Sequence, residues 1–91
     1  MKQDKFNLQH YEKILKEKDI EYVNDGESLR ASVDKRNSDG HHHRTLIITT
    51  GHSGKTFAIL QGFIGAAQVE PMEAIRQFSI AKSVFSMMSD C

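Results

Sequence analysis

The residues best suited to metal chemistry in this 91-residue chain are three consecutive histidines, His41, His42 and His43. A neutral imidazole binds Zn²⁺ or Ni²⁺ through a ring nitrogen. In a strand, His41 and His43 share a face about 6–7 Å apart, because alternate side chains point the same way. A structural zinc site, however, usually has four ligands and often thiolates, and the chain has one cysteine, Cys91. We therefore predict no metal site and interpret the run as a solvated turn and strand start, although added nickel or zinc is expected to bind it in vitro.

A second candidate is the segment from Gly51 to Thr56, which reads Gly-His-Ser-Gly-Lys-Thr and follows the apolar residues 46–48. It matches the end of the phosphate-cradling pattern G-x-x-x-x-G-K-[ST]. Thr49 stands where the first glycine is required, and no later strand ends in an aspartate that could hold Mg²⁺. Nucleotide binding at residues 51–56 is the third of three functional hypotheses. We prefer a hairpin turn in which the glycines supply positive φ angles.

Basic residues cluster around a predicted hairpin at Arg30, Lys35, Arg36 and Arg44. Such a cluster can contact phosphates, so a nucleic-acid-binding hairpin is the second hypothesis. The predicted order of elements, helix, three strands, helix, also resembles that of double-stranded-RNA-binding domains and of small RNA-cleaving toxins. The former carry lysines where residues 71–74 here read Pro-Met-Glu-Ala, and the 12 Lys and Arg are balanced by 12 Asp and Glu. A nucleic-acid binder usually has a basic excess, so we favour a solvated hairpin.

Catalytic constellations are not evident. Ser53 follows His52 directly, but a catalytic triad is defined by geometry and not by adjacency in sequence. Cys91 is the last residue, where we do not expect a nucleophile to be held in place. No pair of carboxylates suggests acid–base chemistry. We therefore expect a protein that is not an enzyme and needs no cofactor.

The elements that position these residues follow from hydrophobic periodicity. Residues 8–18 have helical spacing, with Asn7 as the expected N-cap. Strands are predicted at residues 29–34, 43–50 and 55–61, the last with Phe57 and Ile59 facing the core, and an extra edge strand near residues 20–23. Turns are expected at Asn-Asp-Gly (24–26), Asn-Ser-Asp-Gly (37–40) and Gly-His-Ser-Gly (51–54).

Residues 57–67 are open to a second interpretation, because Phe57, Leu60, Ile64 and Ala67 also fit a helical stripe. Two glycines at positions 62 and 65 would cost such a helix about 1 kcal/mol each relative to alanine. A strand that ends before these glycines avoids that cost. We prefer the strand, and with it a meander.

The C-terminal helix, at residues 71–88, is the clearest element. Its apolar stripe has spacings of three and four: Met72, Ile75, Phe78, Ala81, Phe85 and Met88. A second set, Ile80, Val84 and Met87, lies beside that stripe. This flank is either part of a broad core stripe or an interface for a partner or a second copy, and the sequence weighs both equally.

Together these patterns predict one α+β domain over residues 1–91: a small antiparallel three-stranded meander, with a possible extra edge strand, flanked by an N-terminal and a C-terminal helix. The expected function is a non-enzymatic binding or regulatory module that occupies a surface of a partner protein, with a homodimer as an alternative. Domains of this size are often encoded by phages or mobile elements, and we expect that origin here. The most apolar segment, residues 57–69, is shorter than the about 20 residues that span a membrane, and we expect a cytoplasmic location.

Overall fold

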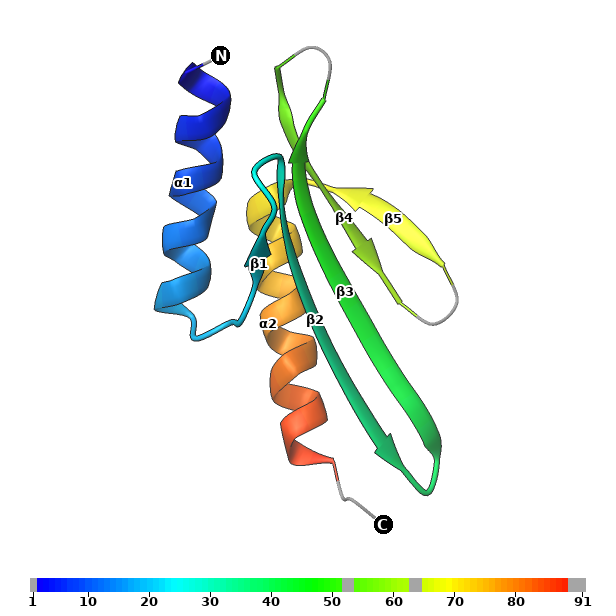
Figure 1. Cartoon of the computed structure of the whole chain (residues 1–91). Coiled ribbons are helices and arrows are strands. Elements are labelled where there is room, and N and C mark those ends of the chain that lie inside the picture. Colours follow the sequence, from blue (N-terminus) through cyan, green and yellow to red (C-terminus); the bar gives the residue numbers. More distant parts are fainter. Residues whose placement is uncertain (1, 52–53, 63–64, 89–91) are drawn as a thin grey trace.

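The computed structural model describes residues 2–51, 54–62 and 65–88. Along the chain, one helix precedes five strands and a second helix follows them (Figure 1). This order confirms the predicted α+β class with its N-terminal and C-terminal helices. The elements are α1 (Lys2–Glu17), β1 (Val23–Asn24), β2 (Ser28–Asn37), β3 (Gly40–Thr50), β4 (Thr56–Gln61), β5 (Ala66–Val69) and α2 (Pro71–Met87).

The five strands form one antiparallel sheet in which each strand pairs with its neighbour in sequence, in the order β1-β2-β3-β4-β5. The longest ladder joins β2 to β3, from Ser28 opposite Thr49 to Asn37 opposite Gly40. An extra edge strand is present as β1, but it has 2 residues, Val23–Asn24, and shares only Val23 with the predicted range 20–23. The fifth strand, β5, was not predicted; it pairs with β4 from Ala66 opposite Gln61 to Val69 opposite Ala58.

Both helices cover the same face of the sheet (Figure 1). Alternate strand residues point to this face, because side chains in a strand have a period of two. The buried cluster contains Leu8 and Leu15 from α1 and Ile75 and Phe78 from α2. Their partners on the sheet include Leu29, Ala31, Leu46, Ile48 and Ala58.

Strand β4 confirms the meander for residues 56–61, but its predicted orientation is wrong. Ala58 is fully buried under the helices and Leu60 packs against the same core, so Phe57 and Ile59 lie on the opposite face. A shift of one residue exchanges the two faces of a strand. The side that faces the helices thus carries the small Ala58, and hydrophobicity alone did not reveal it.

Helix α1 begins at Lys2, so Asn7 lies inside the helix and the prediction that it is the N-cap is wrong. The other end of α1 is closed by Asp19, which has a positive φ of 59°. The Ile20 N–H donates to the Leu15 carbonyl at 3.0 Å. This pattern satisfies the free carbonyls at a helix end and places a buried Ile20 against the last turn.

Side chains of α1 and the sheet edge are joined by the Tyr22 hydroxyl, which donates to Glu12 Oε2 at 2.7 Å. Burial and this hydrogen bond raise the pKa of Tyr22 to about 12. The same hydrogen bond lowers the pKa of Glu12, since it favours the charged carboxylate. This hydrogen bond holds the connection between α1 and β1 against the helix.

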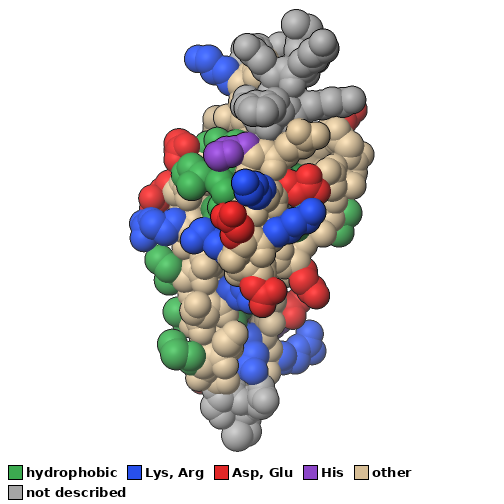
Figure 2. Space-filling model, turned by 90° about the vertical axis from the view of Figure 1, so that its left-hand side faces the viewer, with side chains coloured by type: hydrophobic (Ala, Val, Ile, Leu, Met, Phe, Trp, Pro, Cys, Tyr) green, Lys and Arg blue, Asp and Glu red, His purple; other side chains and the backbone are tan. Residues whose placement is uncertain are grey.

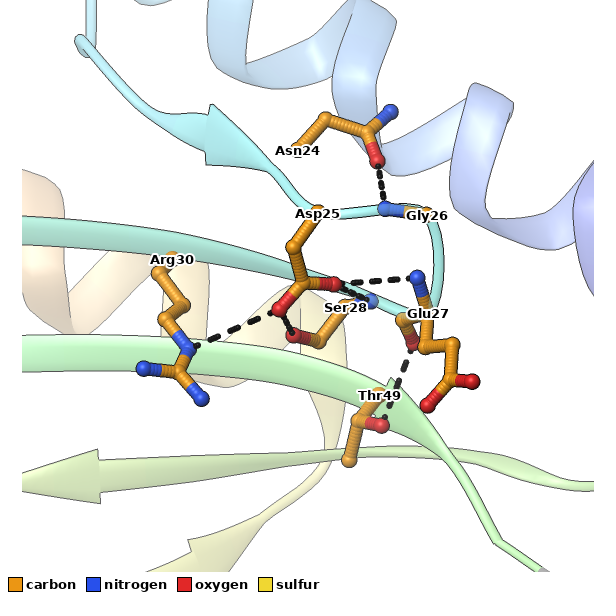
Figure 3. A network of polar contacts seen from close by, with 7 residues as sticks. All are labelled: Asn24, Asp25, Gly26, Glu27, Ser28, Arg30 and Thr49. Carbon is orange, nitrogen blue, oxygen red and sulfur yellow. Dashed lines mark hydrogen bonds and ion pairs between the residues drawn. The ribbon is translucent and has the colours of Figure 1, made fainter.

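The turn between β1 and β2 is organised by two side chains (Figure 3). Asn24 Oδ1 accepts from the Gly26 N–H at 2.8 Å, and Gly26 has a φ of 97° that favours glycine. Asp25 Oδ1 accepts from the Glu27 and Ser28 N–H groups at 3.0 and 2.8 Å. These backbone hydrogen bonds lower the pKa of Asp25. The predicted Asn-Asp-Gly turn is thus confirmed, with the aspartate as its main acceptor.

Helix α2 begins as predicted. Pro71 occupies its first turn, and the Glu70 carboxylate caps it by accepting from the Glu73 N–H at 3.1 Å. The helix then buries Pro71, Ala74, Ile75, Phe78 and Phe85. In the part of the chain that the structure describes, no helix is long and apolar enough to cross a membrane.

Candidate protein-binding surface

Three large hydrophobic side chains lie together on the outer face of α2. Successive helical residues are about 100° apart, so Ile80, Val84 and Met87 fall within about 60° of one another, opposite the buried Phe78. Their exposed fractions are 50% for Ile80, 43% for Val84 and 80% for Met87. We call these three residues the α2 flank. The structure therefore places the predicted interface residues together on the solvent side and not in the core.

The outer face of α2 changes character along its length. In its first half, Arg76 and Gln77 donate to the Glu73 carboxylate. These hydrogen bonds lower the pKa of Glu73 to about 2, and the one from Arg76 has the larger effect. The second half carries the α2 flank, in the part of α2 that extends beyond the end of α1 (Figure 1). The apolar surface is thus bordered on one side by charged groups.

The face on which α1 lies has a different surface (Figure 2). Lysine and arginine side chains there are interspersed with aspartate and glutamate, and hydrophobic side chains gather along its left edge. Mixed charges of this kind are typical of a solvated face. The face of α1 thus differs from the outer face of α2, where exposed apolar side chains gather.

A groove continues the α2 flank towards the β2–β3 hairpin. It has a volume of about 640 Å³ and is lined by Val84, Phe85 and Met88 of α2 and by residues 39–44 of the hairpin. Within it, the ring of His42 lies 6.1 Å from the ring of Phe85. Val84 belongs to both the flank and the groove, so a ligand that covers the flank can also enter the groove.

The basic residues of the hairpin do not form one patch. Register places Arg30 and Arg36 on the open face of the sheet, and Lys35 and Arg44 on the face that bears the helices. Arg30 and Arg36 are six residues apart on β2, about 20 Å in a strand. Arg30 also lies 4.0 Å from Asp25 (Figure 3). A phosphate backbone running over one face would meet two of these four charges.

The P-loop-like segment links two antiparallel strands. Thr50 pairs with Thr56, and the Gly54 N–H donates to the Gly51 carbonyl at 3.0 Å, with a φ of 82° at Gly54. A phosphate-binding loop of this type leads into a helix, whose N-terminus completes the anion site. Here Thr56 begins strand β4. The predicted hairpin is confirmed, but of its two glycines Gly54 has a positive φ and Gly51 does not. His52 and Ser53 lie outside the described residues, as does Cys91.

The histidine run divides between the two faces of the sheet. His42 points to the groove beside Phe85, while His41 and His43 lie on the open face. There they meet Asp34, and the three side chains bring one ligand atom each to within 4.8 Å of one another. Asp34 was not among the candidate ligands predicted from the sequence. The predicted turn at residues 37–40 contained the signal, because a two-residue loop between Asn37 and Gly40 pairs Asp34 with His43.

Comparisons with known proteins add no further constraint: no protein-family model, curated protein or solved structure matches this chain.

Proposed function

We propose that this chain is a non-enzymatic binding module that occupies a surface of a partner protein through the α2 flank. The observation that supports this proposal is the clustering of Ile80, Val84 and Met87, each 43–80% exposed, on one side of a helix whose opposite side is buried. An exposed apolar cluster beside polar neighbours is typical of an interaction site. The single cysteine of the chain is in keeping with a reducing compartment, and we propose that the module acts in the cytoplasm.

The spacing of the flank favours a helical partner. Ile80 to Val84 is four residues and Val84 to Met87 is three, which is the spacing of the seam between two packed helices. Exposed Ser83 lies among these side chains, and its small size lets another backbone approach. We therefore propose that the partner presents an amphipathic helix with apolar residues at the same spacing.

The size of the flank argues for a different protein and not for a second copy of this chain. A stable interface usually involves about 20–30 residues from each side. In a symmetric pair, both copies would offer the same three side chains with the groove beside them. A partner with a larger apolar surface can cover the flank and fill the groove at once. Full burial of a large aliphatic side chain contributes about 1.5–3 kcal/mol. Each flank residue can contribute only part of this free energy on binding, because part of its surface is already buried in the free chain.

Charge substitutions on the flank test the proposal. Ile80→Asp and Met87→Asp are expected to abolish capture of a specific protein from a lysate of the source cells, while thermal melts show that the variants remain folded. Met72→Asp is the matched control, because Met72 is also an exposed methionine of α2, at 44%, but lies outside the flank. Partners are identified by mass spectrometry after cross-linking.

Three results would count against the proposal. Capture that all three variants lose equally would reflect general stickiness. Self-association in ultracentrifugation that Ile80→Asp abolishes would make a second copy the occupant. Co-purification of nucleic acid in low salt, seen as a raised ratio of absorbance at 260 to 280 nm and lost in Arg36→Gln, would favour the basic hairpin instead.

A further inference from the structure

We propose that Asp34, His41 and His43 form a binding site for one divalent transition-metal ion of the zinc class on the open face of the β2–β3 hairpin. One ligand atom from each of the three side chains lies within 4.8 Å of the other two. The Asp34 Oδ2 atom is 3.9 Å from His41 Nε2. The three side chains lie on the face of the sheet opposite the α2 flank, although His41 and His43 also belong to the hairpin segment that lines the groove. Zinc binding does not require the proposed partner.

The backbone fixes the three ligands in place. His41 and His43 are two residues apart on β3 and point to the same side, and their ring centres are 6.1 Å apart. Asp34 lies directly opposite His43 in the ladder, with Arg36 opposite His41. Asp34 is thus the diagonal neighbour of His41, so two adjacent strands present all three groups on one surface.

Small side-chain rotations suffice to close the site around an ion. In a tetrahedral zinc site with metal–ligand bonds of about 2.0–2.2 Å, ligand atoms lie about 3.3–3.6 Å apart. The three groups must therefore draw together by roughly 1 Å, and Asp34 and His41 are exposed and can rotate. Arg36 opposes a bound cation, but its side chain is also exposed and can turn towards solvent.

A fourth residue supports the arrangement. Thr45 Oγ1 lies 2.7 Å from His43 Nε2, and Ser32 Oγ lies 3.4 Å from the same threonine oxygen. When the His43 Nε2–H donates to Thr45 Oγ1, this hydrogen bond holds the imidazole, and Nδ1 keeps the lone pair that a metal needs. Metal-bound histidines regularly have such a partner.

The donor set defines the class of ion. Two imidazoles and one carboxylate suit Zn²⁺ and its neighbours Co²⁺, Ni²⁺ and Cu²⁺, whereas Mg²⁺ and Ca²⁺ prefer oxygen ligands throughout. Three protein ligands leave one tetrahedral position for water or for a group from another molecule. Four ligands from the chain are the rule only for closed structural sites.

Calorimetric titration of the untagged chain with Zn²⁺ tests the site, and Co²⁺ provides a visible absorption spectrum that reports the geometry. We expect one ion per chain. His41→Gln, His43→Gln and Asp34→Asn should each weaken binding at least about tenfold, and Thr45→Val by about 10- to 100-fold, as is usual for the loss of a supporting hydrogen bond. The matched controls are His42→Gln, within the same run, and His10→Gln, an exposed histidine of α1.

Several outcomes would overturn the proposal. If Asp34→Asn and Thr45→Val bind zinc as tightly as the unaltered chain, the site is a pair of surface imidazoles and not a built site. If His42→Gln weakens binding as much as His41→Gln, the run binds metal without the register of the sheet. Circular dichroism of each variant ensures that lost binding is not caused by unfolding.

Discussion

At the scale of single residues, Asp25 is the side chain on which a local structure most clearly depends. Its carboxylate accepts from the backbone N–H groups of Glu27 and Ser28 and from the Ser28 hydroxyl at 3.1 Å. The Thr49 hydroxyl then donates to the Glu27 carbonyl at 3.3 Å, which joins the turn to β3 (Figure 3). One charged group thus orders the entry into the longest ladder of the sheet.

This geometry predicts how stability depends on pH. The pKa of Asp25 is lowered in the folded chain, so its contribution to stability is present above the unfolded pKa of about 3.9 and is lost as pH falls through the lower folded pKa. We expect Asp25→Asn to lower the melting temperature at pH 7 and to make stability fall less steeply below about pH 4. Urea melts at a series of pH values measure both effects.

The control for this prediction is Asp39→Asn, which changes an exposed carboxylate in the turn between β2 and β3. It should leave the pH dependence nearly as it is in the unaltered chain. Equal effects of the two substitutions would mean that net charge, and not the hydrogen bonds of the turn, governs the response.

Single residues were predicted well where a residue type strongly favours one backbone conformation. Gly26 and Gly40, with φ angles of 97° and 128°, were placed in turns because glycine adopts such angles without steric cost. The orientation of β4 was predicted wrongly, because Phe57 is more hydrophobic than Ala58, yet Ala58 and Leu60 are the residues that face the helices. Which face of a strand is buried depends on the shape of the opposing layer, and no local pattern contains that information.

At the scale of elements, α2 has two apolar sides with different expected roles. Phe78 is only 1% exposed, whereas Ile80 is 50% exposed. Phe78→Ala should destabilise the fold by about 3–5 kcal/mol, because it removes a buried aromatic ring and leaves a cavity. Ile80→Asp should cost less than about 1 kcal/mol, since it changes an exposed helical position.

Urea denaturation of both variants, with equal slopes against denaturant as a check for two-state behaviour, measures this difference. Comparable destabilisation by the two substitutions would show that the outer side of α2 is packed in solution. The α2 flank would then not be available to a partner.

Helix α2 and strands β2, β3 and β4 could be predicted because their periodic patterns are long. Strand β5 could not, because residues 66–69 read Ala-Ala-Gln-Val and only the valine strongly favours a strand. Its conformation is set by pairing with β4. The α2 flank was found from helical spacing, whereas the Asp34 cluster was missed because its members become neighbours only through the register of two strands.

At the scale of the whole molecule, the sheet is covered on one face only by the elements that the structure describes (Figure 1). The molecule measures 48 by 26 by 21 Å, and its radius of gyration is 13.8 Å, against about 12 Å for a compact domain of this length. The β2–β3 hairpin and the C-terminal half of α2 both extend beyond the end of α1 (Figure 1). Both proposed sites include residues of the β2–β3 hairpin: the groove lies on the face that bears the helices, and the side chains of the metal ligands lie on the open face.

The order of the strands has a consequence for how the chain reaches this structure. Because every strand pairs with its neighbour in sequence, the mean separation along the chain between contacting residues, the contact order, is low for a protein with so much sheet. Low contact order accompanies fast folding.

We expect refolding from urea, followed by stopped-flow fluorescence of the tyrosines, to be a single exponential on the order of milliseconds. Gly40→Ala should slow this refolding if the β2–β3 hairpin forms in the transition state. A phase lasting seconds would instead indicate that docking of the two helices limits the rate, and that the sheet alone does not direct folding.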